Sequence, residues 1–550
     1  MERVWLKEYP KHIGANINES SFSKLNSIND LVKETKKYSN DTAFVNLNSS
    51  LTYQEVNEYS NRFSSFLQSE LHIQKSSKVA IMLPNLLTFP VTIFGIFKAG
   101  GIAVNINPLY KSREIINVLT DSQAETIVVL DKFLPELEPV ISKSKIKNII
   151  VCKPTNLLSP IMKIIVGIVL FFKNDKTPNK INYINFSTTI KKRNNTFNEK
   201  ITRDDIALLQ YTGGTTGKSK AAVLTHGNLL SNIEQLHSWV KEEVTYRKET
   251  IITALPLYHI FSLTVNLFYF YYIGSKNILI TNPRDLKSFV KTLSKYKFTI
   301  ITAVNTLFNL LMTSSTFKKI DFTNLKFAIG GGMAVLKTTA IKWKKITGVE
   351  ITQGYGLTET SPIISVNKIS EPFNGTIGLP MPSTDISLRN DNSEEVNIGE
   401  EGELCVKGPQ VMKEYWNNQT ETNKSFTSDG FFKTGDIATI NNKGYLTIVD
   451  RKKDMIISSG FNVYPNEIEE YVSTHKDVLE CGVIGKEDSN RGESIILYVV
   501  RLNDAILESD IINYCKEGLT VYKIPKKVIF IKELPKNNVG KILRRKLREL

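Results

Sequence analysis

The sequence contains few of the residues that build disulfide frameworks or metal clusters. Only four cysteines and six histidines occur among its 550 residues. Cys152, Cys405, Cys481 and Cys515 are far apart and show neither the paired spacing of a zinc site nor the density of a secreted disulfide scaffold. A reducing cytoplasm is therefore the expected compartment. The standard nucleic-acid-binding modules are missing as well, so no nucleic-acid partner is expected.

Long apolar segments are also missing. The longest is IMKIIVGIVLFFK at 161–173, where nine apolar residues from Ile164 to Phe172 stand between two lysines. A helix needs about 20 residues to cross a bilayer, so this segment cannot span one. It is expected either to lie in a membrane interface, with its lysines toward anionic head groups, or to be a buried helix or strand. The opening MERVWLKEYPKHIG has no apolar core and no cleavage site, so it is not expected to be a secretory signal.

The composition that remains is that of a globular protein with a basic excess. Hydrophobic residues make up 41% and charged residues 23% of the chain, which argues against a disordered tail or a fibre. A chain of 550 residues exceeds what one core usually holds, so two or more domains are expected. The net charge of +15 comes from lysines spread along the sequence. It indicates either a compositional bias of the source or a basic face for anionic lipid or polyanionic substrates.

Apolar runs that alternate with amphipathic segments predict an α/β fold. Buried strands are expected at 77–85, 101–109 and 124–132, and amphipathic helices at 88–99 and 112–121. This order predicts layered α/β sheets in a large N-terminal domain, with helices covering a largely parallel sheet.

Changes in residue composition and in the spacing of apolar residues along the chain predict the domain boundaries. From about 140 to 200 the sequence is rich in lysine and asparagine and is expected to be a loose connection. Short strands broken by glycine predict a β-rich subdomain at about 380–449. The cluster DRKKDMI then opens a small α+β domain, so the predicted domains are 1–449 and 450–550.

The stretch QYTGGTTGKSKAAVLTH at 210–226 resembles a phosphate-binding loop, GxxxxGK[ST], without matching it. The first required glycine is replaced by Thr212, and Gly213 leaves only three residues before Gly217. The following helix signal comes late, with Asn228 as the expected cap. The sequence therefore predicts a turn between two strands that holds phosphates by another geometry. A plain glycine turn would leave the density of threonine and lysine unexplained.

Six further motifs, together with this loop, resemble in order and spacing the adenylate-forming acyl-CoA synthetases. They are ALPLYHIFSLT at 254–264, GGGMAV at 330–335, QGYGLTETSP at 353–362, FFKTGD at 431–436, DRKKDMIISSGFNVYPNEIEE at 450–470 and LPKNNVGKILRR at 534–545. Within that family the chain is most similar to the bacterial long-chain fatty-acid CoA ligases, and the likeness covers nearly its whole length. Lys218 departs from the pattern, because relatives often carry a small or apolar residue there.

The resemblance implies that ATP, a fatty acid and CoA are the substrates. A fatty carboxylate attacks the α-phosphate of ATP, and the thiol of CoA then attacks the acyl-adenylate and expels AMP. Transfer at phosphorus needs positioned cations and hydrogen-bond donors. The phosphates are therefore assigned to Tyr211, Thr212, Gly213, Gly214, Thr215, Thr216, Gly217, Lys218 and Lys220. Glu359 and Thr215 are the expected ligands of Mg²⁺, a hard cation that prefers oxygen.

The nucleoside site that the resemblance implies is formed by glycine turns and one carboxylate. The residues expected around adenine are Gly331, Gly332, Gln353, Gly354, Tyr355, Gly356 and Thr358. Asp436 is the expected ribose ligand, because a carboxylate accepts from two hydroxyls at once, and Arg451 assists it.

Two further residues are assigned to catalysis. Without context, His259 reads as a core histidine, whereas the resemblance places it in a wall of the acyl pocket. The resemblance also implies that Lys541 bridges the carboxylate and the α-phosphate during adenylation. For thioester formation the small, mobile domain would then turn about Asp450 and present Gly460 and its neighbours to CoA.

Other functions stay open at this point. An adenylate-forming ligase for medium-chain or aryl acids, or one that transfers to a carrier protein, is the main alternative. A non-catalytic nucleotide- or lipid-binding relative is less favoured, because Lys541, Glu359 and Asp436 are all present. The expected location is the cytoplasm, with peripheral contact at the anionic inner face of the membrane. A homodimer is also left open.

Overall fold

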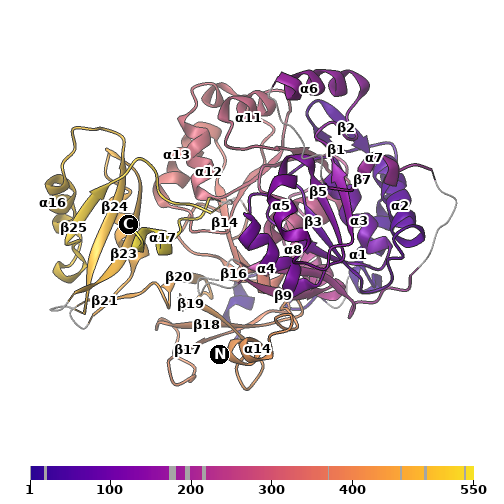
Figure 1. The fold of residues 1–550 in the computed structure, drawn as a ribbon. Coiled ribbons are helices and arrows are strands. Elements are labelled where there is room, and N and C mark those ends of the chain that lie inside the picture. The colour runs from indigo at the N-terminus through magenta and orange to yellow at the C-terminus, as the bar shows by residue number, and fades with distance from the viewer. Residues whose placement is uncertain are drawn as a thin grey trace.

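The structure is a computed structural model, and it describes residues 2–17, 21–172, 181–192, 199–212, 219–369, 371–458, 461–488, 492–537 and 540–550. Strands within these ranges form four sheets (Figure 1). The chain up to Pro380 builds two large sheets with covering helices, and the remainder builds two smaller ones. This arrangement confirms the predicted α/β class with layered sheets.

A seven-stranded sheet contains the three strands predicted first. Its order is β7-β6-β5-β3-β4-β8-β9. The strands are β3 (Lys78–Met82), β4 (Ile102–Asn105), β5 (Thr126–Leu130), β6 (Asn148–Cys152), β7 (Ile184–Asn185), β8 (Ile206–Thr212) and β9 (Lys220–Thr225). Every pair is parallel except β8 and β9, which are antiparallel. Residues 213–218 therefore connect two paired strands, as predicted, although they lie outside the described residues.

A nine-stranded sheet packs beside it. Its order is β16-β15-β14-β13-β12-β10-β11-β1-β2. The strands are β1 (Thr42–Asn46), β2 (Ser49–Thr52), β10 (Thr250–Thr253), β11 (Lys276–Leu279), β12 (Ile300–Ala303), β13 (Phe327–Gly330), β14 (Ile351–Gly356), β15 (Ile363–Val366) and β16 (Leu379–Pro380). The pairs from β1 through β11, β10, β12 and β13 to β14 are parallel, and only the two ends of the sheet are antiparallel.

Helices cover both large sheets. They include α1 (Ile28–Glu34), α2 (Tyr53–Ser69), α3 (Thr88–Lys98), α4 (Ser112–Ser122), α5 (Leu134–Ile141), α6 (Pro160–Phe172), α7 (Phe186–Thr189), α8 (His226–Val240), α9 (Ile260–Ser262), α10 (Phe270–Tyr272), α11 (Leu286–Leu293), α12 (Asn305–Thr313) and α13 (Lys337–Thr347). A π-helix, Leu263–Tyr269, joins α9 to α10. The elements β6, α6, β7 and α7 correct the expectation that about 140–200 is only a loose connection.

Two local predictions about helices are wrong. Residues 88–97 of α3 are all buried, so the helix is not amphipathic: it is enclosed on every side and packs on the π-helix region, with Phe94 and Tyr271 ring centroids 5.1 Å apart. The cap of α8 is Thr225 rather than Asn228. The Thr225 hydroxyl accepts from the Asn228 amide, and Asn228 Oδ1 accepts from the Thr225 amide, which forms a reciprocal capping box.

Two smaller sheets follow, of which the first is antiparallel and the second is antiparallel except for the parallel pair of β24 and β25. The four-stranded sheet contains β17 (Asp385–Arg389), β18 (Gly402–Lys407), β19 (Phe432–Ile440) and β20 (Leu446–Arg451), beside α14 (Gln419–Ser425). The five-stranded sheet contains β21 (Ile456–Ser458), β22 (Phe461–Val463), β23 (Val478–Asp488), β24 (Gly492–Arg501) and β25 (Lys527–Phe530), with α15 (Pro465–Val472), α16 (Glu508–Gly518) and α17 (Arg544–Arg548). The chain leaves the four-stranded sheet after Arg451, one residue beyond Asp450. A hinge at Asp450 stays a prediction.

The four cysteines are free and buried, in agreement with the absence of a disulfide framework. Among the described residues, the helices are all too short or too polar to cross a membrane.

Candidate active site

Four predicted site residues meet where the nine-stranded sheet, the four-stranded sheet and the C-terminal segment come together. The Tyr355 hydroxyl, at the end of β14, donates to Asp436 Oδ2 over 2.5 Å. Asp436 on β19 is opposite Arg451 on β20, and Arg451 Nε lies 3.4 Å from Asp436 Oδ1. Asp436 and Arg451 both act on the charge of Lys541, about 90 residues further along the chain. The fold thus gathers the predicted ribose and adenylation residues into one cluster.

Positively charged side chains outnumber carboxylates in this cluster. Burial, followed by the nearby Arg451 guanidinium, lowers the pKa of Lys541 to about 7, against the opposing effect of Asp436. Burial and Arg451 likewise lower the pKa of Lys453 to about 8. Cations that depress one another's pKa values in this way provide a site for an anion, because an anionic ligand relieves their repulsion. Sequence reasoning did not single out Lys453.

A second group of residues surrounds the predicted metal ligand. The Tyr415 hydroxyl donates to Glu359 Oε1 over 2.7 Å. The Lys220 ammonium forms an ion pair with Glu421 and lies 5.3 Å from the centre of the Tyr415 ring. Burial raises the pKa of Glu359, while Tyr415, Arg451 and Lys220 oppose the shift. Glu359 and Lys220 are therefore close neighbours, held in place by two residues that sequence reasoning missed.

His259 adjoins Lys541 and is neutral at neutral pH. Its Nδ1 accepts from the Phe261 amide at 3.4 Å, at the start of α9. Burial, and then the positive charge of Lys541, lower the pKa of His259 to about 4. The imidazole consequently adds a neutral, polar wall beside the lysine. Its proximity to the site agrees with the role that the resemblance implies.

The predicted adenine residues lie just after β13 and at the end of β14, where the two segments approach each other closely. A Cβ on Gly331 would lie 3.1 Å from Phe261 Cε1 and 3.3 Å from the Gly354 carbonyl oxygen. Gly332 has a φ of +76°, which favours glycine. Gln353 Oε1 accepts from the Val335 amide at 2.6 Å, and Nε2 donates to the Thr376 carbonyl at 2.8 Å. The Gln353 side chain thus braces the turn, and a nucleotide would have to contact this position through the backbone.

Replacement of Gly356 by alanine should destabilise the protein. The added Cβ would lie 1.8 Å from the Pro362 carbonyl oxygen, a backbone atom that can move only if β14 and β15 separate. We expect a loss of about 1–3 kcal/mol in the free energy of unfolding, the usual cost of overpacking. Differential scanning calorimetry measures it. Gly167→Ala is the control, since nothing lies within 4 Å of its Cβ; equal melting temperatures for the two variants would contradict the prediction.

Several predicted residues are placed differently or lie outside the description. Gly213, Gly214, Thr215, Thr216, Gly217, Lys218 and Gly460 are outside the described residues. The Tyr211 hydroxyl donates to Asp121 Oδ2 over 2.6 Å, so its side chain points to α4, and only its backbone could serve the loop. Thr212 Oγ1 donates to the Lys220 carbonyl at 3.4 Å, across the β8–β9 pair. Thr358 begins the 3-10 turn that carries Glu359.

The donor set is compatible with a magnesium ion held largely by a substrate. In the described part of the chain, three or more His, Cys, Asp or Glu side chains never gather into a metal-binding group. Mg²⁺ in phosphoryl-transfer sites is commonly bound by one or two protein oxygens, substrate phosphates and water. Glu359 beside Lys220 supplies such an oxygen, since only its Oε1 is bonded to Tyr415.

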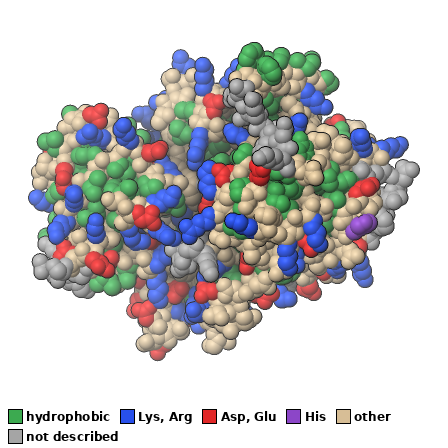
Figure 2. Space-filling view, viewed as in Figure 1, with side chains coloured by type: hydrophobic (Ala, Val, Ile, Leu, Met, Phe, Trp, Pro, Cys, Tyr) green, Lys and Arg blue, Asp and Glu red, His purple; other side chains and the backbone are tan. Residues whose placement is uncertain are grey.

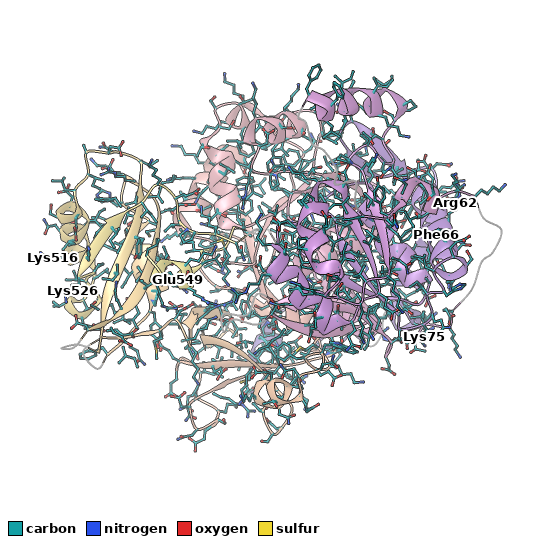
Figure 3. All side chains as sticks on the ribbon, viewed as in Figure 1. Arg62, Phe66, Lys75, Lys516, Lys526 and Glu549 are labelled. Carbon is teal, nitrogen blue, oxygen red and sulfur yellow. The ribbon has the colours of Figure 1, made fainter. Side chains whose placement is uncertain are left out.

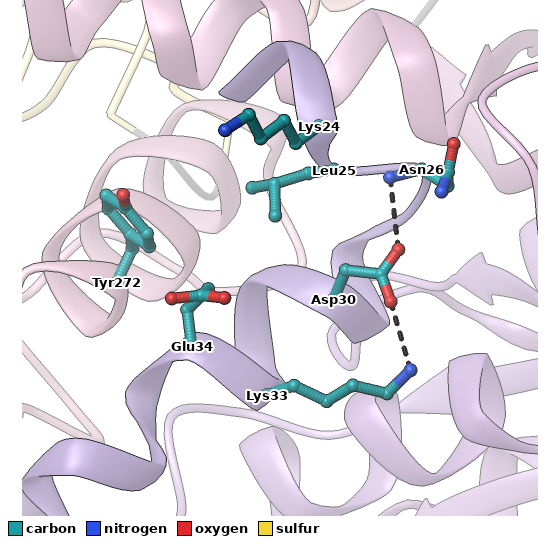
Figure 4. A pocket seen from close by; sticks show the side chains of 7 residues that line it. All are labelled: Lys24, Leu25, Asn26, Asp30, Lys33, Glu34 and Tyr272. Carbon is teal, nitrogen blue, oxygen red and sulfur yellow. Dashed lines mark hydrogen bonds and ion pairs between the residues drawn. The ribbon is translucent and has the colours of Figure 1, made fainter. Parts of the chain in front are cut away.

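The pocket in Figure 4 is separate from this site. It has a volume of about 460 Å³, and its lining consists of Lys24, Leu25, Asn26, Asp30, Lys33, Glu34 and Tyr272. Asp30 already accepts from the Asn26 amide and the Lys33 ammonium, both at 3.0 Å. The predicted site residues that the structure describes do not border it.

Comparison with known families agrees with the geometry. A family model described as AMP-binding enzyme matches residues 31–416, and one described as AMP-binding enzyme C-terminal domain matches residues 467–541. The chain belongs to the AMP-binding enzyme family. Curated relatives in this family include the long-chain-fatty-acid–CoA ligase of Yersinia pestis, which is 44% identical over 554 aligned residues covering 100% of this chain and 98% of the relative. The Haemophilus influenzae enzyme of the same name is 43% identical with the same coverage.

Solved structures of this family share the architecture. An anthranilate CoA ligase in complex with anthranoyl-AMP superposes with a TM-score of 0.86 at 25% identity, covering 96% of this chain and 98% of that structure. A fatty acyl CoA synthetase from Mycobacterium tuberculosis superposes with a TM-score of 0.68 at 27% identity, covering 95% and 98%. Both likenesses extend over the large N-terminal and the small C-terminal parts of the chain.

Proposed function

We propose that this protein is a long-chain-fatty-acid–CoA ligase that forms acyl-CoA, AMP and diphosphate from a fatty acid, ATP and CoA. The observation that carries the proposal is the full-length identity of 43–44% to curated ligases of that name. The cluster of Tyr355, Asp436, Arg451 and Lys541 supports it, because an AMP-forming ligase needs donors and cations around a nucleotide.

In the proposed first step, a carboxylate oxygen of the fatty acid attacks the α-phosphorus of ATP. The bond to the β-phosphate oxygen breaks, and diphosphate leaves. Lys541 stabilises the negative charge that develops on the transferring phosphate, and Lys220 and the glycine loop bind the departing diphosphate. Asp436 accepts from the ribose hydroxyls, with its orientation fixed by Tyr355 and Arg451. Mg²⁺, when bound through Glu359, would neutralise part of the phosphate charge.

In the second step, the thiol of CoA attacks the acyl carbon, and the bond to the phosphate oxygen of AMP breaks. The electron pair leaves with AMP, and the thiol proton passes to solvent. We infer that the segment after Asp450 turns between the two steps, so that Lys541 withdraws and Gly460, Phe461 and Asn462 approach the thiol. The exposed side chain of Phe461 is compatible with a face that is used only in the second step.

We also assign the enzyme to the cytoplasm, in contact with the anionic inner face of the membrane, where its substrate partitions. A homodimer stays a prediction that sedimentation velocity can test.

Release of diphosphate from the purified protein tests the function. ATP, Mg²⁺ and saturated acids from acetate to stearate would be supplied with and without CoA. Turnover that rises with chain length and needs CoA to continue is the expected result. If diphosphate is released only with short or aryl acids, the proposed mechanism would stand, but the substrate class would differ from the one proposed. A failure to release diphosphate with any acid would overturn the proposal.

ATP binding should be accompanied by proton uptake at pH 8. Because Lys541 has a pKa of about 7 in the free protein, it is mostly neutral at this pH. Phosphates beside it raise that pKa, so ATP binding draws in up to about 0.9 proton. Isothermal titration calorimetry in buffers of different ionisation enthalpy measures the uptake. In Lys541→Arg most of it should disappear, because arginine is already charged; an unchanged proton count in that variant would refute the assignment.

A further inference from the structure

Helix α6 exposes an unusual number of apolar side chains. None of its residues is buried. Seven of the twenty large apolar side chains that are exposed among the described residues belong to its thirteen positions. They are Ile161, Ile164, Ile165, Ile168, Val169, Phe171 and Phe172, and the two phenylalanines are each 81% exposed. Figure 2 shows their side chains gathered at the upper edge of the molecule. The structure therefore excludes the buried alternative for this segment.

The exposed side chains form one face of the helix. Ile161, Ile164, Ile165, Ile168 and Phe172 follow the spacing that places residues on a single stripe of an α-helix. Met162 and Val166, on the other side, pack against the main core. The helix is thus attached by its inner side and directs an apolar stripe about 20 Å long away from the protein.

Basic and apolar residues of two neighbouring elements adjoin this stripe. The Ser159 amide, just before α6, donates to Ser49 Oγ at 3.0 Å in the β1–β2 hairpin. The Lys295 ammonium, just after α11, donates to Asn48 Oδ1 at 2.9 Å in the same hairpin. These bonds hold α6 and α11 side by side at the upper rim in Figure 1. The hairpin adds exposed Leu47, and the α11 region adds three exposed lysines, Lys287, Lys291 and Lys295.

Charge alone would not distinguish this surface. Basic side chains occur all over the molecule, for example Arg62 and Lys75 at one end and Lys516 and Lys526 at the other (Figure 3). The upper rim differs because lysines lie beside a continuous apolar stripe, the combination that binds helices to anionic membrane surfaces.

We propose that α6, the hairpin turn at Leu47 and the lysines Lys287, Lys291 and Lys295, together called the α6 face, dock the protein on an anionic lipid bilayer. The apolar stripe enters the boundary between head groups and acyl chains, and the lysines contact anionic head groups. A second copy of the chain fits less well, since a symmetric contact would bring the lysines of both copies together around the apolar stripe. The biological purpose, delivery of membrane-dissolved fatty acid, rests on the proposed function.

Co-sedimentation with vesicles tests the α6 face. The full-length protein would be mixed with vesicles of phosphatidylcholine alone, or of phosphatidylcholine and phosphatidylglycerol in equal parts. We expect binding to the anionic vesicles only. Ile164→Glu/Ile168→Glu should weaken it at least about tenfold, since two apolar side chains leave the interface. Lys287→Gln/Lys291→Gln should weaken it by about fivefold per lysine.

The matched control is Leu502→Glu/Leu507→Glu, which changes two leucines of similar exposure, 60% and 62%, in the C-terminal part. It should bind like the unaltered protein. A second measurement is independent of lost binding: Phe171→Trp should show a blue shift of tryptophan fluorescence on addition of anionic vesicles.

Equal binding by the α6 variant and the control, or no blue shift, would overturn the proposal. The proposal would also be overturned if the unaltered protein does not bind vesicles and forms a dimer that dissociates to monomers when Ile164 and Ile168 are replaced by glutamate. Ligase activity on dispersed octanoate is recorded separately and should be unchanged in the α6 variant. If the protein activates no acid but binds vesicles through α6, the proposed ligase function is refuted and the proposed docking surface is supported.

Discussion

Replacement of Lys541 by alanine should slow acyl-adenylate formation by about 100- to 1,000-fold, the usual cost of removing one group that stabilises charge in the transition state. The lysine lies with Arg451 and Asp436, and burial and repulsion by Arg451 lower its pKa. Its positive charge is therefore costly in the free site and is stabilised when negative charge develops on the phosphate. An interaction that strengthens in this way lowers the barrier more than it tightens substrate binding. Diphosphate release in a single turnover, with fatty acid and ATP but no CoA, measures the effect.

The second half-reaction provides the internal control. When supplied with preformed acyl-adenylate and CoA, Lys541→Ala should form acyl-CoA at close to the unaltered rate, because the proposed turn of the C-terminal segment withdraws Lys541 before that step. Lys546→Ala, which changes an exposed lysine on α17, should leave both halves unchanged. An equal loss in both half-reactions of Lys541→Ala would show that the lysine does not act in adenylation alone.

Features that depend on local pattern could be predicted from the sequence. Apolar runs identified β3, β4 and β5, because strands buried on both faces need uninterrupted apolar residues. The antiparallel pairing of β8 and β9 on either side of the glycine loop agrees with the prediction drawn from its failed spacing. Asp436 and Lys541 were selected by motif resemblance, and the structure brings them to one cluster although about 100 residues separate them.

Pairings between distant segments could not be predicted in this way. Tyr415 and Glu421 have no motif of their own, yet they hold Glu359 and Lys220. Such partners are set by α14 and the segment before it, in which Tyr415 forms an antiparallel bridge with Ala222 of β9, and a local pattern does not record this pairing. Helix α3 was predicted to be amphipathic, but Thr88 and Thr92 are buried together with the apolar residues of the helix.

A buried ionic network connects the predicted hinge to the segment that carries Lys541. Arg544 Nη2 lies 2.9 Å from Glu469 Oε2 and donates to Asn466 Oδ1 at 2.7 Å. Its Nη1 lies 3.5 Å from both Asp450 Oδ1 and Asp454 Oδ2. The Arg544 guanidinium thus forms ion pairs with three carboxylates, and one of them, Asp450, is fully buried. The network holds the start of α17, three residues after Lys541, against Asp450, the last residue but one of β20.

Replacement of Arg544 by methionine should destabilise the C-terminal part by about 3–5 kcal/mol, the cost of leaving buried charges without their partner. The effect should depend on pH. Burial already raises the pKa values of Asp450 and Glu469, and Arg544 opposes both shifts. Without the arginine these pKa values rise further above their unfolded values, so the folded variant takes up protons more readily. Its deficit is then largest near neutral pH and shrinks as the pH falls.

Thermal unfolding at pH 7.5 and pH 5 compares the variant with Arg545→Gln. The neighbouring Arg545 pairs only with Glu549 among the described residues, at 3.4 Å on the surface, so its loss should cost less than about 0.5 kcal/mol at either pH. If Arg544→Met loses equal stability at both pH values, a packing defect rather than unpaired carboxylates accounts for the loss. If it melts like Arg545→Gln, the Arg544 network does not hold α17 in place.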